Sequence, residues 1–163
     1  MVNIIDTVCA KADEASIRQA GQILKRGGLV AFPTETVYGL GADALNEDAA
    51  AKIYAAKGRP SDNPLIVHIT ERKMLDAIVS EVSAQAELLM EKFWPGPMTL
   101  IFKKSARVPY GTTGGLDTVA VRMPSHPSAR AVIDAGGGYL AAPSANTSGR
   151  PSPTKAAPVE VDL

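Results

Sequence analysis

The stretch LVAFPTETVYGLGADALNEDAAAKIYAAKG, residues 29–58, decides the fold class of this chain. Its first residues are apolar and predict a short buried strand over 29–32. The polar segment 33–41 that follows contains glycines and predicts a loop. Asn46 can then cap a helix over 47–57, which a glycine ends. A strand, a loop and a helix in this order form the basic unit of an α/β sheet.

Strands and helices continue to alternate on both sides of this stretch. Before it, apolar residues share one face of a predicted helix over 15–26. After it we expect, in chain order, a strand at 65–69, a helix at 70–79 capped by Thr70, a helix at 83–93 capped by Ser83, strands at 98–102 and 118–122, a helix at 127–134 begun by Pro127, a strand at 139–142 and an irregular tail from Pro143. The alternation predicts the α/β class, and the unequal spacing favours a mixed sheet.

Length and composition indicate one globular domain over residues 1–163, because 45% of the residues are apolar and 21% are charged. The net charge of zero argues against nucleic-acid binding as the sole task. One cysteine, Cys9, cannot form an internal disulfide, and two histidines are too few for a histidine-based zinc site. Residues 1–10 lack a signal-peptide pattern, and no apolar run is long enough to span a membrane. We therefore expect a cytoplasmic protein that does not contact membranes.

The segment PTETVYGLG, residues 33–41, gathers polar side chains directly after the first predicted strand. Ligands of open α/β sheets bind beyond the carboxyl ends of strands, so Thr34, Thr36 and Tyr38 are candidate binding residues. Hydroxyl groups in a tight connection can equally serve to satisfy backbone groups. The residue types alone leave both interpretations open.

The segment KGRPSDNP, residues 57–64, places two cations at the end of a predicted helix. Lys57 and Arg59 can converge on a polyphosphate, with arginine as a bidentate donor and lysine as a point charge. They can also simply complement the carboxyl end of the helix. His68 follows in the next strand, and its residue type alone is more typical of a structural histidine.

Three further segments carry candidate binding groups. Arg122 lies at the end of the apolar strand in TVAVRMP, residues 118–124, and needs an anionic partner, which is either a protein carboxylate or a ligand carboxylate. APSANTSGRPSPT, residues 142–154, is dense in hydroxyl and amide groups that can cradle phosphates and ribose, although a generic loop has a similar composition. WPGPMT, residues 94–99, indicates a sharp turn into a strand. The chain contains no Walker A loop and no strict G-x-G-x-x-G motif.

Taken in order, the segments PTETVYGLG, KGRPSDNPLIVHI, WPGPMTLIF, TVAVRMP and APSANTSGRPSPT resemble the YrdC family of threonylcarbamoyl-AMP synthases. The resemblance covers nearly the whole chain from about residue 15. It implies a twisted mixed sheet with flanking helices around a concave basic cavity. It also implies a nucleotidyltransferase that makes threonylcarbamoyl-adenylate and pyrophosphate from L-threonine, bicarbonate and ATP. The product serves the threonylcarbamoyladenosine modification of tRNA, which this chain would meet only through the partner proteins that perform the transfer.

The resemblance also implies roles for individual residues. Contacts with L-threonine are implied for Thr34, Thr36, Tyr38, His68 and Arg122. Contacts with ATP are implied for Lys57, Arg59, Asn63, Thr118, Ser144, Asn146 and Ser152, of which Lys57 and Arg59 are the candidate catalytic residues. Magnesium is expected on the phosphates of ATP, with few dedicated protein ligands. Catalysis would then consist of positioning and charge neutralisation, without a covalent nucleophile.

In the family, the segment that PSPT matches is followed by a helix and by further strands, whereas this chain ends at Leu163. We therefore expect an exposed sheet edge and a pocket that is open along one wall. Two other functions remain as alternatives. One is an RNA-binding or ribosome-maturation module that uses the same basic cavity, with weak RNA binding. The other is a carbamoyl-adenylate former, like the YrdC-like domain of hydrogenase-maturation proteins.

Overall fold

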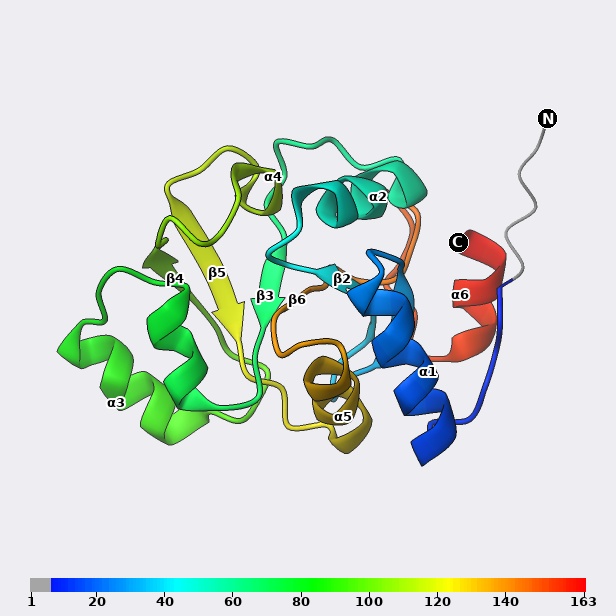
Figure 1. Ribbon diagram of the computed structural model, residues 1–163, viewed down its shortest axis with the longest axis horizontal. Coiled ribbons are helices and arrows are strands. Elements are labelled where there is room, and N and C mark those ends of the chain that lie inside the picture. The colour runs from blue at the N-terminus through cyan, green and yellow to red at the C-terminus, as the bar shows by residue number, and fades with distance from the viewer. Residues whose placement is uncertain (1–6) are drawn as a thin grey trace.

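The computed structural model describes residues 7–163 (Figure 1). Residues 1–6, which include most of the apolar start considered for a signal peptide, lie outside the described residues. A six-stranded sheet runs in the order β1-β2-β6-β3-β5-β4. Its strands are β1 (Val30–Pro33), β2 (Tyr38–Asp43), β3 (Ile66–His68), β4 (Thr99–Lys103), β5 (Thr118–Arg122) and β6 (Leu140–Ala141). The helices are α1 (Glu14–Lys25), α2 (Glu47–Lys57), the 3₁₀ helix η1 (Arg72–Ala77), α3 (Ala84–Phe93), α4 (Tyr110–Thr113), α5 (Pro127–Ala135) and α6 (Ala156–Asp162).

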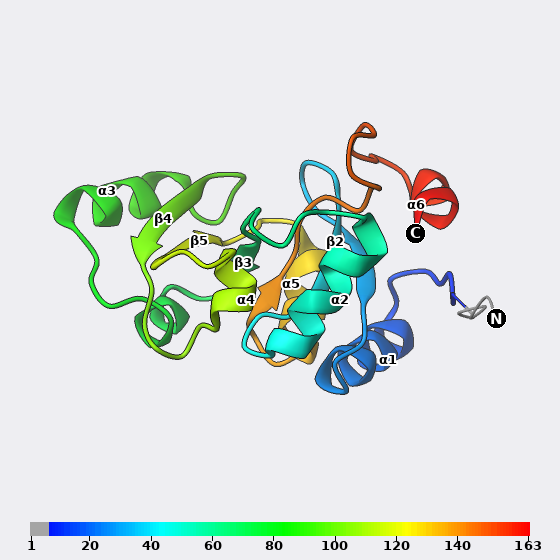
Figure 2. The same cartoon turned by 90° about the horizontal axis from the view of Figure 1, so that it is seen from above.

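The sheet is mixed, which confirms the prediction. β3 and β5 run parallel, and the other paired strands are antiparallel. α1 packs against α5, while α2 packs against β2 and α4. Figures 1 and 2 place α3 beside β4 at one end of the molecule and α6 at the other end. The two parallel strands therefore lie between these ends, within the sheet.

Local signals in the sequence set the ends of the helices. The side chain of Asn46 accepts a hydrogen bond from the backbone N–H of Ala49 at 3.2 Å, and α2 begins at the next residue. Gly58 ends α2 in the left-handed conformation, with φ of 58°, which glycine adopts without strain. Ser83 caps α3 in the same way as Asn46, through the N–H of Ala86 at 3.2 Å. These caps confirm the predicted positions of both helices.

The predicted loop over 33–41 is wrong, because its second half belongs to β2. Residues Val30–Pro33 pair with Tyr38–Gly41 in an antiparallel hairpin, so only the short turn between them is a loop. A Cβ atom at Gly41 would lie 2.7 Å from the ring of Phe32, which shows that this glycine permits close packing. The glycines therefore belong to a tightly packed strand and do not mark a loop.

Thr70 does not cap a helix, contrary to the prediction. Its hydroxyl donates to the carboxylate of Asp134 in α5, and the segment after it forms η1 in place of an α-helix. Two helices were also not predicted, namely the short α4 and α6 in the tail. α6 is held through its last turn, where the carboxylate of Asp162 accepts from Arg150 at 2.6 Å. These contacts join residues that the local sequence pattern does not connect.

The interior is formed by two clusters of buried apolar residues. The larger cluster includes Val67 of β3 and Val121 of β5, both fully buried. The smaller one lies where α1 and α5 meet β1, and it contains Phe32 and Leu140. Among residues 7–163, no helix is both long enough and apolar enough to cross a membrane.

Candidate functional site

Polar side chains from several of the predicted segments meet at one cavity of about 290 Å³. The cavity lies at the carboxyl ends of β3 and β5, where His68 and Arg122 are partners in the parallel register. This is the position at which open α/β sheets bind their ligands. The lining residues are Thr34, Thr36, Val37, Tyr38, Gly39, Arg59, Pro64, Ile66, His68, Arg122, Ala142, Pro143 and Ser144.

A larger hollow of about 390 Å³ borders α3, but its chemistry is less suited to a ligand. Its lining includes Arg72 and Glu87, which pair with each other, so much of its charge is already satisfied. The remaining lining consists of Met90, Trp94, Met123 and one further carboxylate, Glu91. The polar cavity at the ends of β3 and β5 is therefore the candidate functional site.

The turn between β1 and β2 contributes two hydroxyl groups to the cavity. Thr34 donates to the backbone carbonyl of Val37 at 2.7 Å and accepts from the backbone N–H of Thr36 at 3.2 Å. Its oxygen also lies 3.1 Å from the hydroxyl of Thr36. Thr34 thus holds the turn in shape, which is the backbone role that the sequence left open, and both hydroxyls still line the cavity.

Arg122 has a protein carboxylate as its partner, which is one of the two alternatives left open by the sequence. Its Nη2 donates to Oε1 of Glu35, and both side chains are mostly buried, with 12% and 19% of their surface exposed. Burial alone would raise the pKa of Glu35. The hydrogen bond and the positive charge of Arg122, together with backbone N–H groups that include that of His126, jointly outweigh this effect, so the pKa of Glu35 lies below its usual range and the carboxylate is ionised near neutral pH.

The guanidinium of Arg122 keeps a donor that has no acceptor within residues 7–163. Nη2 also donates to the hydroxyl of Thr36 at 3.2 Å. Nε is buried and has no hydrogen-bond partner among the described residues. Buried donors are nearly always paired in folded proteins, so this Nε is an exception, and it belongs to a residue that lines the cavity.

His68 is almost fully buried, with 2% of its surface exposed. Burial, together with the nearby positive charge of Arg122, lowers the pKa of His68 to about 4, so the ring is neutral at pH 7. Nδ1 lies 3.1 Å from the backbone carbonyl of Ile66, which can only accept, so Nδ1 carries the proton. The other ring nitrogen is then an acceptor.

The two predicted catalytic cations differ in position. Arg59 lines the cavity, and its guanidinium donates to the backbone carbonyls of Asn63 at 3.3 Å and Pro64 at 3.0 Å. Lys57 is not among the lining residues. Its ammonium group is buried and donates to the backbone carbonyls of Ser144 and Asn146. Lys57 therefore holds the loop after β6, while Arg59 faces the cavity.

Residues of the loop after β6 also divide between the cavity and the protein interior. Ser144 lines the cavity and forms an isolated bridge with Gly39 of β2. Asn146 is buried, and its Nδ2 donates to the carbonyls of Thr147 at 3.0 Å and Arg150 at 2.8 Å. Its Oδ1 has no partner among the described residues.

Besides Lys57 and Asn146, three further residues assigned to ATP lie outside the lining of the cavity. Asn63 is exposed and contributes its carbonyl to Arg59. Thr118 is the exposed first residue of β5, at the end of the strand opposite to Arg122. Ser152 is exposed in the loop before α6. Their proposed contacts with ATP stay predictions.

Residues 22–163 match the model of the Sua5/YciO/YrdC family, which is described as "Telomere recombination". This chain belongs to the Sua5/YciO/YrdC family. Curated relatives in the comparison carry the name threonylcarbamoyl-AMP synthase. The protein of Pyrococcus abyssi is 53% identical over 99% of this chain and 48% of its own length. The protein of Bacillus subtilis is 55% identical over 93% of this chain and 44% of its own length. That of Halorhodospira halophila is 43% identical over 82% of this chain and 70% of its own length.

Solved structures of the Sua5/YciO/YrdC family have the same fold. The structure of P. abyssi Sua5 complexed with L-threonine matches this chain with a TM-score of 0.90 and 55% identity. The match covers 92% of this chain and 44% of that protein. The chain thus spans about half the length of the Pyrococcus and Bacillus relatives that it matches.

Proposed function

We propose that this chain forms threonylcarbamoyl-adenylate and pyrophosphate from L-threonine, bicarbonate and ATP. Its membership of the family and the shared name of the curated relatives support this activity. The observation that carries the proposal is the mostly buried, positively charged Arg122 in the lining of a polar cavity, beside the hydroxyl groups of Thr34 and Thr36. An arginine in such a lining suits the carboxylate of an amino acid.

On the threonine side, Arg122 binds the carboxylate of the substrate, and the hydroxyls of Thr34 and Thr36 lie beside it. Neutral His68 adds an acceptor without adding a second positive charge. The described lining contains no carboxylate, so it offers the amine of threonine no anionic partner that would favour the protonated form. Tyr38 completes this part of the lining.

The chemistry needs no covalent bond to the protein. The amine of threonine attacks carbon dioxide derived from bicarbonate and loses a proton, which forms a carbamate. A carbamate oxygen then attacks the α-phosphorus of ATP. The bond from this phosphorus to the bridging oxygen breaks, and pyrophosphate leaves. A site for this reaction acts by orienting two anionic reactants and by offsetting their charge.

On the ATP side, Arg59 and Ser144 line the cavity and are the proposed contacts with the phosphates and the nucleotide. Lys57 supports ATP binding indirectly, because it holds the backbone of Ser144 and Asn146 in place. The unpaired Oδ1 of Asn146 is a further acceptor next to this loop. Asn63, Thr118 and Ser152 are proposed to contact ATP from outside the cavity described here.

Magnesium is proposed to enter with the phosphates of ATP. Residues 7–163 hold no group of three or more His, Cys, Asp or Glu side chains that is able to bind a metal ion. Mg²⁺ commonly keeps several waters and binds substrate phosphates, so such a group is not required. The product would pass to the proteins that modify tRNA, and this chain would meet tRNA through them.

The proposed function is tested by measuring pyrophosphate release with this chain. Release should require L-threonine and bicarbonate together, and omission of either should reduce it to background. Arg122→Met should weaken L-threonine binding about a hundredfold, because a charge-assisted bond is lost. The matched control is Arg18→Met, which breaks an exposed ion pair with Glu14 on α1 and should leave binding unchanged.

Two outcomes would contradict the proposal. One is pyrophosphate release that does not depend on threonine. The other is the absence of threonine binding to the unchanged chain in calorimetric titration. Tight, salt-sensitive binding of tRNA without any threonine-dependent release would instead favour the RNA-binding alternative.

A further inference from the structure

Glu35 occupies an unusual position next to the candidate site. It lies in the turn between β1 and β2, between two threonines that line the cavity, yet it is not itself part of the lining. Its side chain instead turns to Arg122, which is 87 residues away in the sequence. Glu35 therefore binds a residue of the cavity wall without lining the cavity itself.

Both oxygens of this carboxylate are used, and they connect three segments of the chain. Oε1 accepts from Arg122 at the end of β5. Oε2 accepts from the backbone N–H groups of Ser125 at 3.2 Å and His126 at 3.3 Å, directly before α5. The turn that carries Thr34 and Thr36 is thereby fixed to the strand end that carries Arg122.

The contact also determines how Arg122 presents its remaining donors. A guanidinium group is planar, so fixing Nη2 on Glu35 and Thr36 limits the directions that its other N–H groups can take. Nε remains buried and unpaired in this arrangement. Because Arg122 lines the cavity, an anionic ligand there meets a guanidinium that is already oriented, and little freedom is lost on binding.

We infer that Glu35 is a positioning residue for the amino-acid substrate, which orients the guanidinium of Arg122 for the carboxylate of L-threonine. This inference rests on the proposed function. Glu35 acts through Arg122 and does not touch the ligand. A purely structural carboxylate would support folding and both ligands equally, whereas a positioning residue affects threonine selectively.

The test compares the affinities of L-threonine and ATP by calorimetric titration of the full chain. Glu35→Gln keeps the size of the side chain but removes its charge. We expect it to weaken L-threonine binding by about tenfold to a hundredfold, because the charge-assisted bond to Arg122 is lost. ATP affinity should stay within about twofold. Pyrophosphate release should show the same split, with a raised KM for threonine and a KM for ATP near the original value.

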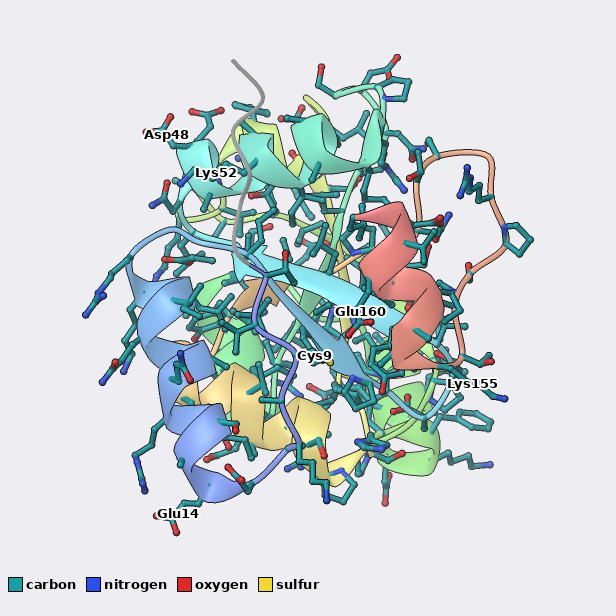
Figure 3. The ribbon with its side chains drawn as sticks, turned by 90° about the vertical axis from the view of Figure 1, so that its right-hand side faces the viewer. Cys9, Glu14, Asp48, Lys52, Lys155 and Glu160 are labelled. Atoms are coloured by element: carbon teal, nitrogen blue, oxygen red, sulfur yellow. The ribbon has the colours of Figure 1, made fainter. Side chains whose placement is uncertain are left out.

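The matched control is Glu14→Gln in α1. Glu14 also forms an ion pair with an arginine, Arg18, but this pair is exposed, and Figure 3 shows Glu14 at the outer end of α1. Its substitution should leave both affinities unchanged. If Glu35→Gln fails to fold, Glu35→Asp serves as the second variant, because it keeps the charge and shortens the reach. It too should weaken threonine more than ATP.

The outcomes separate this inference from the proposed function. If the unchanged chain binds L-threonine and both Glu35 variants bind it equally well, the role of Glu35 is wrong and the proposed function stands. An equal loss of threonine and ATP affinity would assign Glu35 a structural role only. If the unchanged chain does not bind L-threonine, the proposed function fails, and the inference fails with it.

Discussion

At the scale of single residues, Lys57 connects the end of α2 to the loop after β6. Only 1% of the surface of Lys57 is exposed, and its ammonium group donates to two backbone carbonyls. Burial, with a smaller contribution from the positive charge of Arg59, lowers the pKa of Lys57 to about 8. In the unfolded chain a lysine titrates near ~10.4. The protonation of this one side chain therefore differs between the two states.

This difference predicts a pH dependence of stability. Between about pH 8 and about pH 10.5 the unfolded state binds the proton more tightly, so the free energy of unfolding should rise with pH. The rise due to Lys57 is at most about 3 kcal/mol, because each pKa unit corresponds to about 1.4 kcal/mol. Lys57→Met should lack this rise. Urea unfolding at pH 7.5 and pH 10 measures it.

The control for this prediction is Lys155→Met, since Lys155 is exposed at the start of α6, as Figure 3 shows. It should keep the pH dependence of the original chain. If Lys57→Met showed the same rise, the pH dependence would come from other groups and not from Lys57.

Single residues also show where sequence-based prediction stops. The sequence indicated that Arg122 needs an anion, and the structure provides Glu35. No local pattern could select Glu35, because the pair is formed only when the β1–β2 turn meets the end of β5. The need for a partner at Arg122 was the one available signal. Likewise, the sequence predicts that Lys57 contacts phosphate. It cannot show that Lys57 instead binds the backbone of residues 144–146, because this contact is formed only in the tertiary fold.

At the scale of elements, local chemistry was sufficient where the determinant lies within a few residues. Asn46, Gly58 and Ser83 fixed the ends of α2 and the start of α3 as predicted. β2 was missed because its glycines also fit a loop, and only pairing with β1 distinguishes the two. Thr70 was misassigned because Asp134, far away in the sequence, takes its hydroxyl.

The β1–β2 hairpin yields a prediction at this scale. Gly41→Ala would place a methyl group about 2.7 Å from the ring of Phe32, which is 1% exposed and cannot easily move. We expect a loss of about 1–3 kcal/mol in the free energy of unfolding, as for other overpacked sites. Urea unfolding provides the measurement.

The control variant for the hairpin is Ala31→Ser, at an exposed position of β1. Its effect should stay within about 0.5 kcal/mol. If Gly41→Ala were as stable as the original chain, the close approach of β2 to Phe32 would not limit side-chain size there.

At the scale of the whole molecule, the two apolar clusters share a strand. In β6, Leu140 belongs to the smaller cluster and Ala141 to the larger one. Neither cluster can lose its packing without disturbing the other through this strand. The predicted single domain therefore has a physical test, which is the cooperativity of its unfolding.

We expect residues 1–163 to unfold in one transition. The chain has one tryptophan, Trp94, which lies in the larger cluster, so its fluorescence reports that cluster. α1 and α5 pack on the smaller cluster and contribute to the far-ultraviolet circular dichroism. Urea titrations followed by the two signals should give coincident midpoints. Midpoints that differ beyond error would indicate two units that fold separately.

The contacts of Lys57 have one more consequence, for how the site can vary. They are made with the main-chain oxygens of Ser144 and Asn146, and the N–H of Ala145 likewise binds the main-chain oxygen of Tyr38. None of these bonds depends on which side chains the loop carries. A substitution at Ser144, which lines the cavity, can therefore change the group offered to a ligand while the course of the loop is preserved, so that selectivity and architecture are adjustable independently at this position.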